Sequence, residues 1–357
     1  MGTKLLMKGN EALAEAAIRA GVKGYFGYPI TPQSELLEYM SRHLPERGGS
    51  FVQAESEVAA INMIYGAAGC GERAMTSTSS PGYSLMQEGI SYIACAQLPC
   101  LLVNVVRGGP GLGTIQPSQG DYLQAVKGGG HGDYKTVVLA PNSVQEMADL
   151  VYLGFDLADK YRNPVLILAD GALGQMMEAV EFPEYDVEAN KVDHSSWATR
   201  GRIDKRPQHS ISSLHLLAEQ MEDINRVLIE KYSRITANEV RYEEIATTDA
   251  QMLLVAFGLS SRVCQKSIEL AREEGLKVGL LRPISLWPFP SEPINALADQ
   301  VSSVFTVEMN AGQMVEDVRL AVNGKKPVYF YGRQGGMVPQ PEEILEKIRE
   351  HYIGETN

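Results

Sequence analysis

One hydroxyl in the sequence stands between rigid residues. The stretch "GYFGYPITPQSEL" at 24–36 places Thr31 between Pro29 and Pro32, directly after an aromatic run typical of a strand. A proline near a helix start is ordinary in the turn between a strand and a helix. Prolines on both sides of Thr31 go further, because they fix the backbone that carries its hydroxyl. The pattern predicts a side chain that is aimed at a ligand.

Further candidates follow the next three strands that the sequence predicts. In an open parallel sheet, ligands bind beyond the carboxyl ends of the strands. Those positions hold carboxylates, a hydroxyl, a glycine and a guanidinium: Glu55 and Glu57 in "QAESE", Ser80 and Gly82 in "TSTSSPG", and Arg107 before "GGPGLGT". We expect all of them at one edge of the sheet.

Two of these residues have an ordinary reading beside the functional one. Glu57 begins a predicted helix, and a glutamate there commonly compensates the positive end of the helix dipole. Arg107 follows a nearly continuous apolar run, so its guanidinium needs an anionic partner or the mouth of a cleft. Both readings stay open from the residues alone.

Other motifs are weaker. "GGPGLG" at 108–113 is not followed by a helix start, so it does not match a dinucleotide-binding loop and is better read as a substrate-facing loop. His131 lies in the glycine-rich loop 127–133. A lone histidine in a loop is more often a solvated side chain than a catalytic one, so His131 is a weak candidate for acid–base catalysis. "VEMNAGQM" at 307–314 is read as a domain or subunit contact. Neither a phosphate-binding P-loop nor a serine-nucleophile elbow occurs.

Composition excludes several classes of protein. The chain has 357 residues, 44% of them hydrophobic and 21% charged, with a net charge of -12, so no basic face for nucleic acid is expected. No apolar run approaches the ~20 residues of a membrane span. The four cysteines form no C-x-x-C pair, which leaves no readable zinc or iron–sulfur site and favours a reduced, cytoplasmic chain.

The predicted elements alternate between strand and helix. Residues 1–182 read as a doubly wound α/β domain, with a helix over 9–20, a buried strand over 100–106 and one helix over 81–97. Residues 183–245 read as a crossover with one helix, whose apolar stripe is Leu214, Leu217, Met221, Ile224 and Leu228. Residues 246–357 read as a second, smaller α/β domain.

These segments together resemble the α subunit of the 2-oxoacid:ferredoxin oxidoreductases, over nearly the whole chain. The motifs that carry the resemblance are "GYPITPQSEL", "QAESEVAAINMIYGAA", "TSTSSPGYSLMQEGI", "LLVNVVRGGPGLGT", "QPSQGDYLQA", "RPISLWPFP" and "VEMNAGQM". The resemblance implies a pyrimidine-binding domain of the thiamine-diphosphate enzymes, followed by a domain like the C-terminal domain of transketolase. "MKGNEALAEAAIRAG" and the extended loop at 108–121 most resemble subunits that act on branched-chain 2-oxoacids, especially 3-methyl-2-oxobutanoate.

The resemblance also implies roles for the candidate residues. Glu57, preferred to Glu55 by its spacing to "YGAA", would bond N1′ of the cofactor's aminopyrimidine and so favour loss of the thiazolium C2 proton. Thr31 would reach the reacting 2-oxoacid, and Arg107 its carboxylate. Pro29, Ser80 and Gly82 would complete the cofactor contacts of this chain, which holds no metal ligands.

The family's G-D-G motif for diphosphate and Mg²⁺ is missing, as is any cysteine set for a cluster. The resemblance therefore implies a β subunit that carries the diphosphate, Mg²⁺ and a 4Fe–4S cluster, with γ and ferredoxin-like δ subunits. The implied reaction converts a 2-oxoacid, coenzyme A and oxidised ferredoxin into acyl-CoA, CO₂ and reduced ferredoxin. Pyruvate, 2-oxoglutarate or an aryl 2-oxoacid as substrate remains an alternative, as does a non-catalytic subunit that completes a partner's site.

Overall fold

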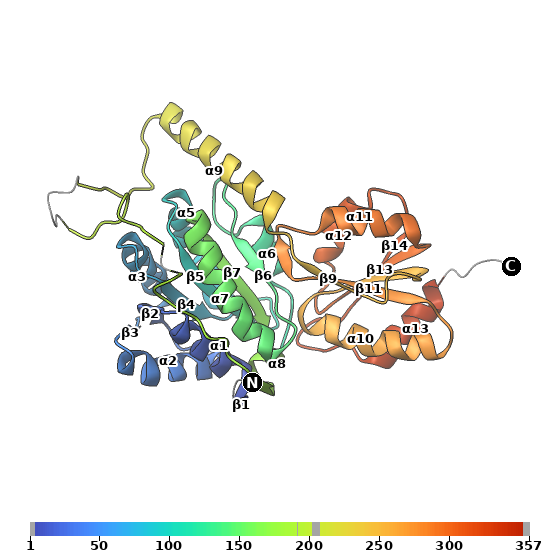
Figure 1. Cartoon of the computed structure of the whole chain (residues 1–357). Coiled ribbons are helices and arrows are strands. Elements are labelled where there is room, and N and C mark those ends of the chain that lie inside the picture. Colours follow the sequence, from blue (N-terminus) through green and yellow to red (C-terminus); the bar gives the residue numbers. More distant parts are fainter. Residues whose placement is uncertain (1–3, 191, 202–207, 353–357) are drawn as a thin grey trace.

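A computed structural model of the chain describes residues 4–190, 192–201 and 208–352. Two α/β lobes lie side by side and are joined near the end of the long helix α9 (Figure 1). The elements of the first lobe are β1 (Leu5–Lys8), α1 (Gly9–Arg19), β2 (Gly24–Gly27), α2 (Ser34–Glu46), β3 (Ser50–Gln53), α3 (Glu57–Gly69), β4 (Ala74–Thr78), α4 (Ser80–Leu85), α5 (Gln87–Cys95), β5 (Cys100–Val106), α6 (Tyr122–Lys127), β6 (Val137–Leu139), α7 (Val144–Tyr161), β7 (Pro164–Asp170), α8 (Gly171–Gln175) and β8 (Met177–Val180).

Helix α9 (Ala218–Asn238) leads from the first lobe to the second. The elements of the second lobe are β9 (Tyr242–Ile245), β10 (Met252–Val255), α10 (Gly258–Glu273), β11 (Val278–Pro283), β12 (Ser285–Trp287), α11 (Ser291–Gln300), β13 (Ser303–Glu308), α12 (Met314–Val322), β14 (Val328–Gly332) and α13 (Pro341–His351). None of the helices in the described ranges is long and apolar enough to cross a membrane.

The first sheet has seven strands in the order β12-β6-β7-β5-β4-β2-β3. Every residue of its central strands β5 and β7 is buried, as expected for apolar runs with helices on both faces of a parallel sheet. One face is covered by a core that includes α1, α2 and α7, and the other by a core that includes α3 and α5. The doubly wound fold predicted from the sequence is confirmed.

The second sheet has five strands in the order β14-β13-β10-β11-β9. Strand β9 lies within the segment that the sequence assigned to a crossover, and it pairs antiparallel with β11. Strand β12 leaves the second lobe and pairs antiparallel with β6, where Trp287 lies opposite Val138. It covers an edge of the first sheet that would otherwise present unpaired backbone groups. The domain boundaries at 182/183 and 245/246 stay a prediction.

Two helices differ from the prediction. The helix expected over 81–97 is two helices, α4 and α5, which meet at Met86. The helix with the apolar stripe begins only at Ala218, so Leu214 and Leu217 precede it and are exposed. Near Leu214, the hydroxyl of Ser212 accepts a hydrogen bond from the Leu214 N–H, a local turn that competes with helix formation.

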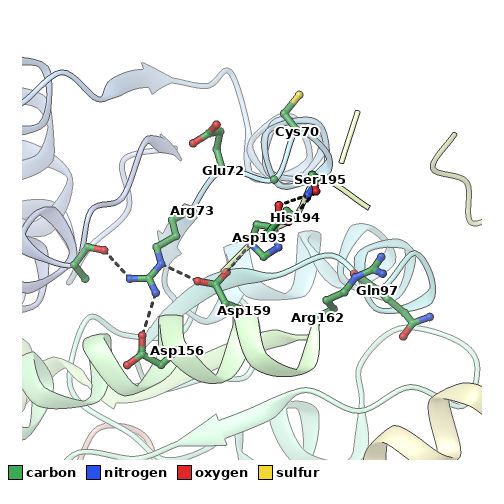
Figure 2. A network of polar contacts seen from close by, with 12 residues as sticks. Cys70, Glu72, Arg73, Gln97, Asp156, Asp159, Arg162, Asp193, His194 and Ser195 are labelled. Carbon is green, nitrogen blue, oxygen red and sulfur yellow. Dashed lines mark hydrogen bonds and ion pairs between the residues drawn. The ribbon is translucent and has the colours of Figure 1, made fainter. Parts of the chain in front are cut away.

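The crossover after β8 is held to the first lobe by a partly buried ion-pair network (Figure 2). Arg73, just before β4, pairs with Asp159 at 2.8 Å and with Asp156 at 3.0 Å, both on α7. From the crossover, His194 Nε2 lies 3.4 Å from Asp159 Oδ1 and the Tyr185 hydroxyl accepts from Arg73. The network lies at the amino end of β4, so it serves the fold rather than the carboxyl edge where the candidates gather.

Candidate active site

The strand order brings the candidate residues to one edge. Strands β5, β4, β2 and β3 are neighbours and run parallel, so their carboxyl ends lie together. Thr31 follows β2, Glu57 follows β3, Ser80 follows β4 and Arg107 follows β5. The strand order therefore confirms the prediction that these candidate residues follow strands whose carboxyl ends lie at one edge of the sheet.

Glu57 is the first residue of α3 and only 4% exposed. The helix starts there because Ser56 is in an extended conformation and its hydroxyl accepts from the Ala59 N–H at 3.2 Å. Within the described residues, no side chain or backbone group forms a hydrogen bond or ion pair with the Glu57 carboxylate. A carboxylate that is so little exposed and has no donor gives up much of its hydration, which favours a functional role over simple charge compensation. Glu55, two residues earlier, is exposed.

Gly82 makes the space for that carboxylate. A β-carbon built on Gly82 would lie 2.3 Å from Glu57 Oε1 and 2.0 Å from Thr78 Oγ1. Any larger residue at position 82 would displace one of these side chains. The nearby Ser79 hydroxyl is buried and has no partner among the residues that the structure describes. The side chains of Glu57 and Thr78 thus meet over Gly82 at the start of α4.

Arg107 joins the turn of Thr31 to the following loop. Its Nη1 donates to the Thr31 carbonyl at 2.9 Å and its Nη2 to the Leu112 carbonyl at 3.0 Å. No described carboxylate pairs with it. Thr31 itself is exposed, as is Pro29, so the hydroxyl is free to meet a ligand from outside. The guanidinium holds the backbone of both segments while its charge stays unneutralised.

Ser80 ties α4 to the end of β5. Its hydroxyl lies 3.1 Å from the Arg107 N–H and 3.2 Å from the Arg107 carbonyl. Asp121, which the sequence reasoning did not select, lies beside it and accepts from Asn104 Nδ2 at 2.8 Å. Burial raises the pKa of Asp121, an effect that hydrogen bonds from Ser80 and Asn104 oppose. The signal that could have found Asp121 is the "GDY" that ends the loop.

The loop after Arg107 is fixed to the second lobe through Gln119. Gln119 donates to the Met309 and Phe257 carbonyls, and its side-chain oxygen accepts from Ser260 and from the Met309 N–H. Its own carbonyl accepts from Asn310. The interpretation of "VEMNAGQM" as a domain contact is confirmed.

Two other features lie away from this edge. His131 is exposed, and its ring lies edge-on to that of Tyr92 with 6.1 Å between the ring centroids. A cavity of about 1090 Å³ opens between α9, residues 127–135 and residues 287–293, and none of Thr31, Glu57 and Arg107 lines it. In the described part of the chain, no group of three or more His, Cys, Asp or Glu side chains could hold a metal ion.

Two family models match the chain. Residues 15–246 match the thiamine-diphosphate-binding domain of pyruvate flavodoxin/ferredoxin oxidoreductases, and residues 250–344 match core domain II of pyruvate:ferredoxin oxidoreductase. The sequence is 54% identical over 345 residues to the ketoisovalerate oxidoreductase subunit VorB of Methanothermobacter thermautotrophicus, covering 97% of each chain. It is 37% identical over 352 residues to the 2-oxoglutarate synthase subunit KorA of Archaeoglobus fulgidus, covering 96% of this chain and 98% of that one.

Solved structures agree. A 2-oxoglutarate:ferredoxin oxidoreductase from Magnetococcus marinus, with 2-oxoglutarate, coenzyme A and succinyl-CoA bound, matches with a TM-score of 0.86 at 27% identity, over 99% of this chain and 66% of that one. A split-gene transketolase shares the fold alone, with a TM-score of 0.60 at 13% identity over 98% of each chain. Both the resemblance read from the sequence motifs and the expected pairing of a thiamine-diphosphate domain with a transketolase-like domain are confirmed. The chain belongs to the 2-oxoacid:ferredoxin oxidoreductases and is a subunit of such an enzyme.

Proposed function

We propose that this chain is the α subunit of a thiamine-diphosphate-dependent oxidoreductase that acts on a branched-chain 2-oxoacid. The enzyme converts the 2-oxoacid, coenzyme A and oxidised ferredoxin into acyl-CoA, CO₂ and reduced ferredoxin. Support for the substrate class comes from two ketoisovalerate oxidoreductase subunits, 54% and 53% identical over nearly the full length. The 2-oxoglutarate synthase subunits are more distant, at 34% to 37%.

The buried, unpartnered carboxylate of Glu57 above Gly82 is the observation that carries the proposal. A protonated or N–H-bearing ring nitrogen would supply the donor that this carboxylate lacks, which is the contact that an aminopyrimidine N1′ makes. The residues therefore fit the pyrimidine half of thiamine diphosphate. Glu57 and Gly82 would bind the ring, and Pro29, Ser80 and Thr31 would line its surroundings.

When bound, the cofactor supplies a carbon nucleophile for the 2-oxoacid carbonyl and accepts the electron pair left by CO₂. The chain's own residues prepare the site. Glu57 holds a proton shared with N1′, and its burial strengthens that hydrogen bond. Thr31 orients the 2-oxoacid through its hydroxyl. Arg107 offers positive charge to the substrate carboxylate from a position fixed by two carbonyls.

The remainder of the machinery is assigned to partners. We place the diphosphate contacts, Mg²⁺ and a 4Fe–4S cluster in a β subunit, with γ and ferredoxin-like δ subunits in a cytoplasmic assembly. The chain's own cysteines support this division, because Cys100 and Cys264 are buried in separate cores and the described residues contain no group of three or more His, Cys, Asp or Glu that could hold a metal ion. The division of the chain at 182/183 and 245/246 is part of the same proposal.

A 2-oxoglutarate enzyme is the second candidate, favoured by the neighbour that binds 2-oxoglutarate and succinyl-CoA. The decisive experiment copurifies the chain with its β subunit and follows viologen reduction with 3-methyl-2-oxobutanoate. We expect reduction that requires both coenzyme A and thiamine diphosphate. A complex that holds the cofactor but fails to reduce viologen with every 2-oxoacid tested would overturn the enzymatic function. The chain would then be a binding subunit.

A further inference from the structure

The turn that carries Thr31 is held mainly by side chains. Pro29 and Pro32 have no N–H, so the turn has few internal donors, and one backbone bond closes it, from the Gln33 N–H to the Ile30 carbonyl at 3.2 Å. Three other carbonyls accept hydrogen bonds from side chains. The Tyr28 carbonyl accepts from Gln33 at 3.3 Å, and the Thr31 carbonyl accepts from Arg107 at 2.9 Å.

The third of these carbonyls, that of Pro32, belongs to the residue directly after Thr31. It accepts a hydrogen bond of 2.8 Å from the side-chain amide of Asn10, the second residue of α1. Asn10 is 0% exposed, and its Nδ2 also donates to Glu35 Oε2 at 3.0 Å. A buried amide that donates to the turn and to the first turn of the helix that follows it is well suited to fix one against the other.

Further contacts hold Asn10 and Glu35 in place. Gln175, from α8, donates to Glu35 Oε2 at 2.7 Å and to the Pro32 carbonyl at 3.3 Å. Lys8 lies 3.1 Å from Glu35 Oε1. Burial alone would raise the pKa of Glu35, but hydrogen bonds from its backbone, Gln175, Lys8 and Asn10 outweigh this and lower it. Glu35 is thus held ionised as an acceptor for Asn10.

We propose that Asn10 is a positioning residue for Thr31, which sets the place of its hydroxyl by fixing the Pro32 carbonyl. The inference rests on the proposed function, in which Thr31 meets the 2-oxoacid. Arg107 holds the Thr31 carbonyl and Asn10 holds the next carbonyl, that of Pro32, so loss of the Asn10 amide leaves the Pro32 carbonyl with only the longer bond of 3.3 Å from Gln175. Because a misplacement of about 1 Å can cost ~100-fold in rate, the effect should appear in kcat.

Asn163 is a matched control for this role. It is also 0% exposed, and its Nδ2 also donates to two acceptors, the carbonyls of Lys135 and Pro164, each at 3.0 Å. It precedes β7 and so lies at the amino ends of the strands. Replacing either asparagine by alanine removes the same buried group, with similar expected loss of stability, but only Asn10 contacts the turn of Thr31.

The test is a double-mutant cycle in the purified complex with its β subunit. Asn10→Ala should lower kcat by about 10- to 100-fold when Thr31 is present, and by less than about twofold in the Thr31→Ala background, because the hydroxyl it positions is gone. Asn163→Ala should change kcat by the same small factor in both backgrounds. An Asn10→Ala effect of equal size in both backgrounds would overturn the positioning role while leaving Thr31 as a substrate contact.

Two further outcomes are decisive. If Thr31→Ala alone leaves kcat unchanged, the role of Thr31 in the proposed function fails, and the inference fails with it. If Asn10→Ala does not fold, Gln175→Ala takes its place, because Gln175 is exposed and donates to the same Pro32 carbonyl. Gln175→Ala should lower kcat by less than Asn10→Ala would, and this decrease should disappear in the Thr31→Ala background. A decrease that persists in that background would refute the positioning of Thr31.

Discussion

The Glu57 carboxylate lies over Gly82 so closely that a β-carbon on Gly82 would be 2.3 Å from Glu57 Oε1. Only glycine leaves this space, so the buried carboxylate and the start of α4 depend on each other. The relationship joins two segments that follow different strands, β3 and β4. It gives Gly82 a steric role that can be tested separately from the chemistry of Glu57.

Gly82→Ala should therefore abolish most of the turnover of the complex, at least about 100-fold, because the added methyl group displaces the Glu57 carboxylate or Thr78. Steady-state viologen reduction measures the loss. Gly66→Ala is the matched control, since Gly66 lies in helix α3 and a β-carbon there meets nothing within 4 Å. That control should keep wild-type turnover and gain up to about 1 kcal/mol of stability. Normal turnover in Gly82→Ala would contradict the assigned geometry.

The isolated chain should bind thiamine diphosphate poorly and be inactive. In the proposed division of the site the chain contacts the pyrimidine half only, and the sequence contains no G-D-G motif for the diphosphate and Mg²⁺. Isothermal calorimetry should detect no tight binding until the β subunit is added. Micromolar, Mg²⁺-dependent binding by the chain alone would contradict the division of the site between subunits.

A buried lysine should make stability depend on pH. Lys231 on α9 is 2% exposed and donates to the Arg162 carbonyl at 3.0 Å. Burial, with the charges of Arg162 and Arg234, lowers its pKa to about 7. Between pH 7 and the ordinary lysine pKa, the unfolded chain binds a proton that the folded chain does not, so stability rises with pH in that window.

Urea unfolding at several pH values between 7 and 10 measures the slope, to which Lys231 contributes at most about 1.4 kcal/mol per pH unit. Lys231→Met should flatten it and give its largest gain in stability near pH 7. Lys266→Met, at an exposed position of α10, should leave the slope nearly unchanged. An equal slope in Lys231→Met and in the unchanged chain would show that Lys231 is not held neutral.

The preferred substrate should be a branched aliphatic 2-oxoacid. A second carboxylate, as in 2-oxoglutarate, needs a second cation, and residues 108–114 supply none. In the proposed site Arg107 already serves the first carboxylate, and Lys127 pairs with Asp317. Aliphatic side chains need only an apolar pocket, where one methylene changes discrimination by ~10–200-fold.

Specificity constants from viologen reduction should therefore be highest for 3-methyl-2-oxobutanoate, graded among its longer relatives and at least about tenfold lower for 2-oxoglutarate. A maximum for 2-oxoglutarate or an aryl pyruvate would overturn the substrate assignment and leave the family membership intact.

Local sequence patterns predicted the parts of this structure that local interactions decide. The apolar run at 100–106 is a fully buried strand, and Glu57, expected at a helix start, is the first residue of α3. The candidate residues could be found because parallel strands bring their carboxyl ends together. The choice of Glu57 over Glu55 from spacing agrees with the burial of Glu57 and the exposure of Glu55.

Long-range contacts were not predictable in this way. Nothing in "SLW" indicates that β12 leaves its own lobe to pair with β6. The contact of Asn10 with Pro32 and that of Asp121 with Asn104 join residues from separate elements. The hydrophobic periodicity of a single helix or strand therefore cannot predict them. The late start of α9 reflects a serine turn that interrupts an otherwise helical stripe.

In the proposed function, Glu57 activates a cofactor that is shared with a partner subunit. Exchange of the C2 proton of bound thiamine diphosphate for deuterium, followed by NMR after acid quench, tests it without substrate or electron transfer. In the complex with its β subunit, Glu57→Gln should slow this exchange by about 100-fold or more with the cofactor still bound, because an amide cannot supply the anion at N1′. Glu55→Gln should exchange at the wild-type rate. Equal exchange in Glu57→Gln and wild type would contradict the account.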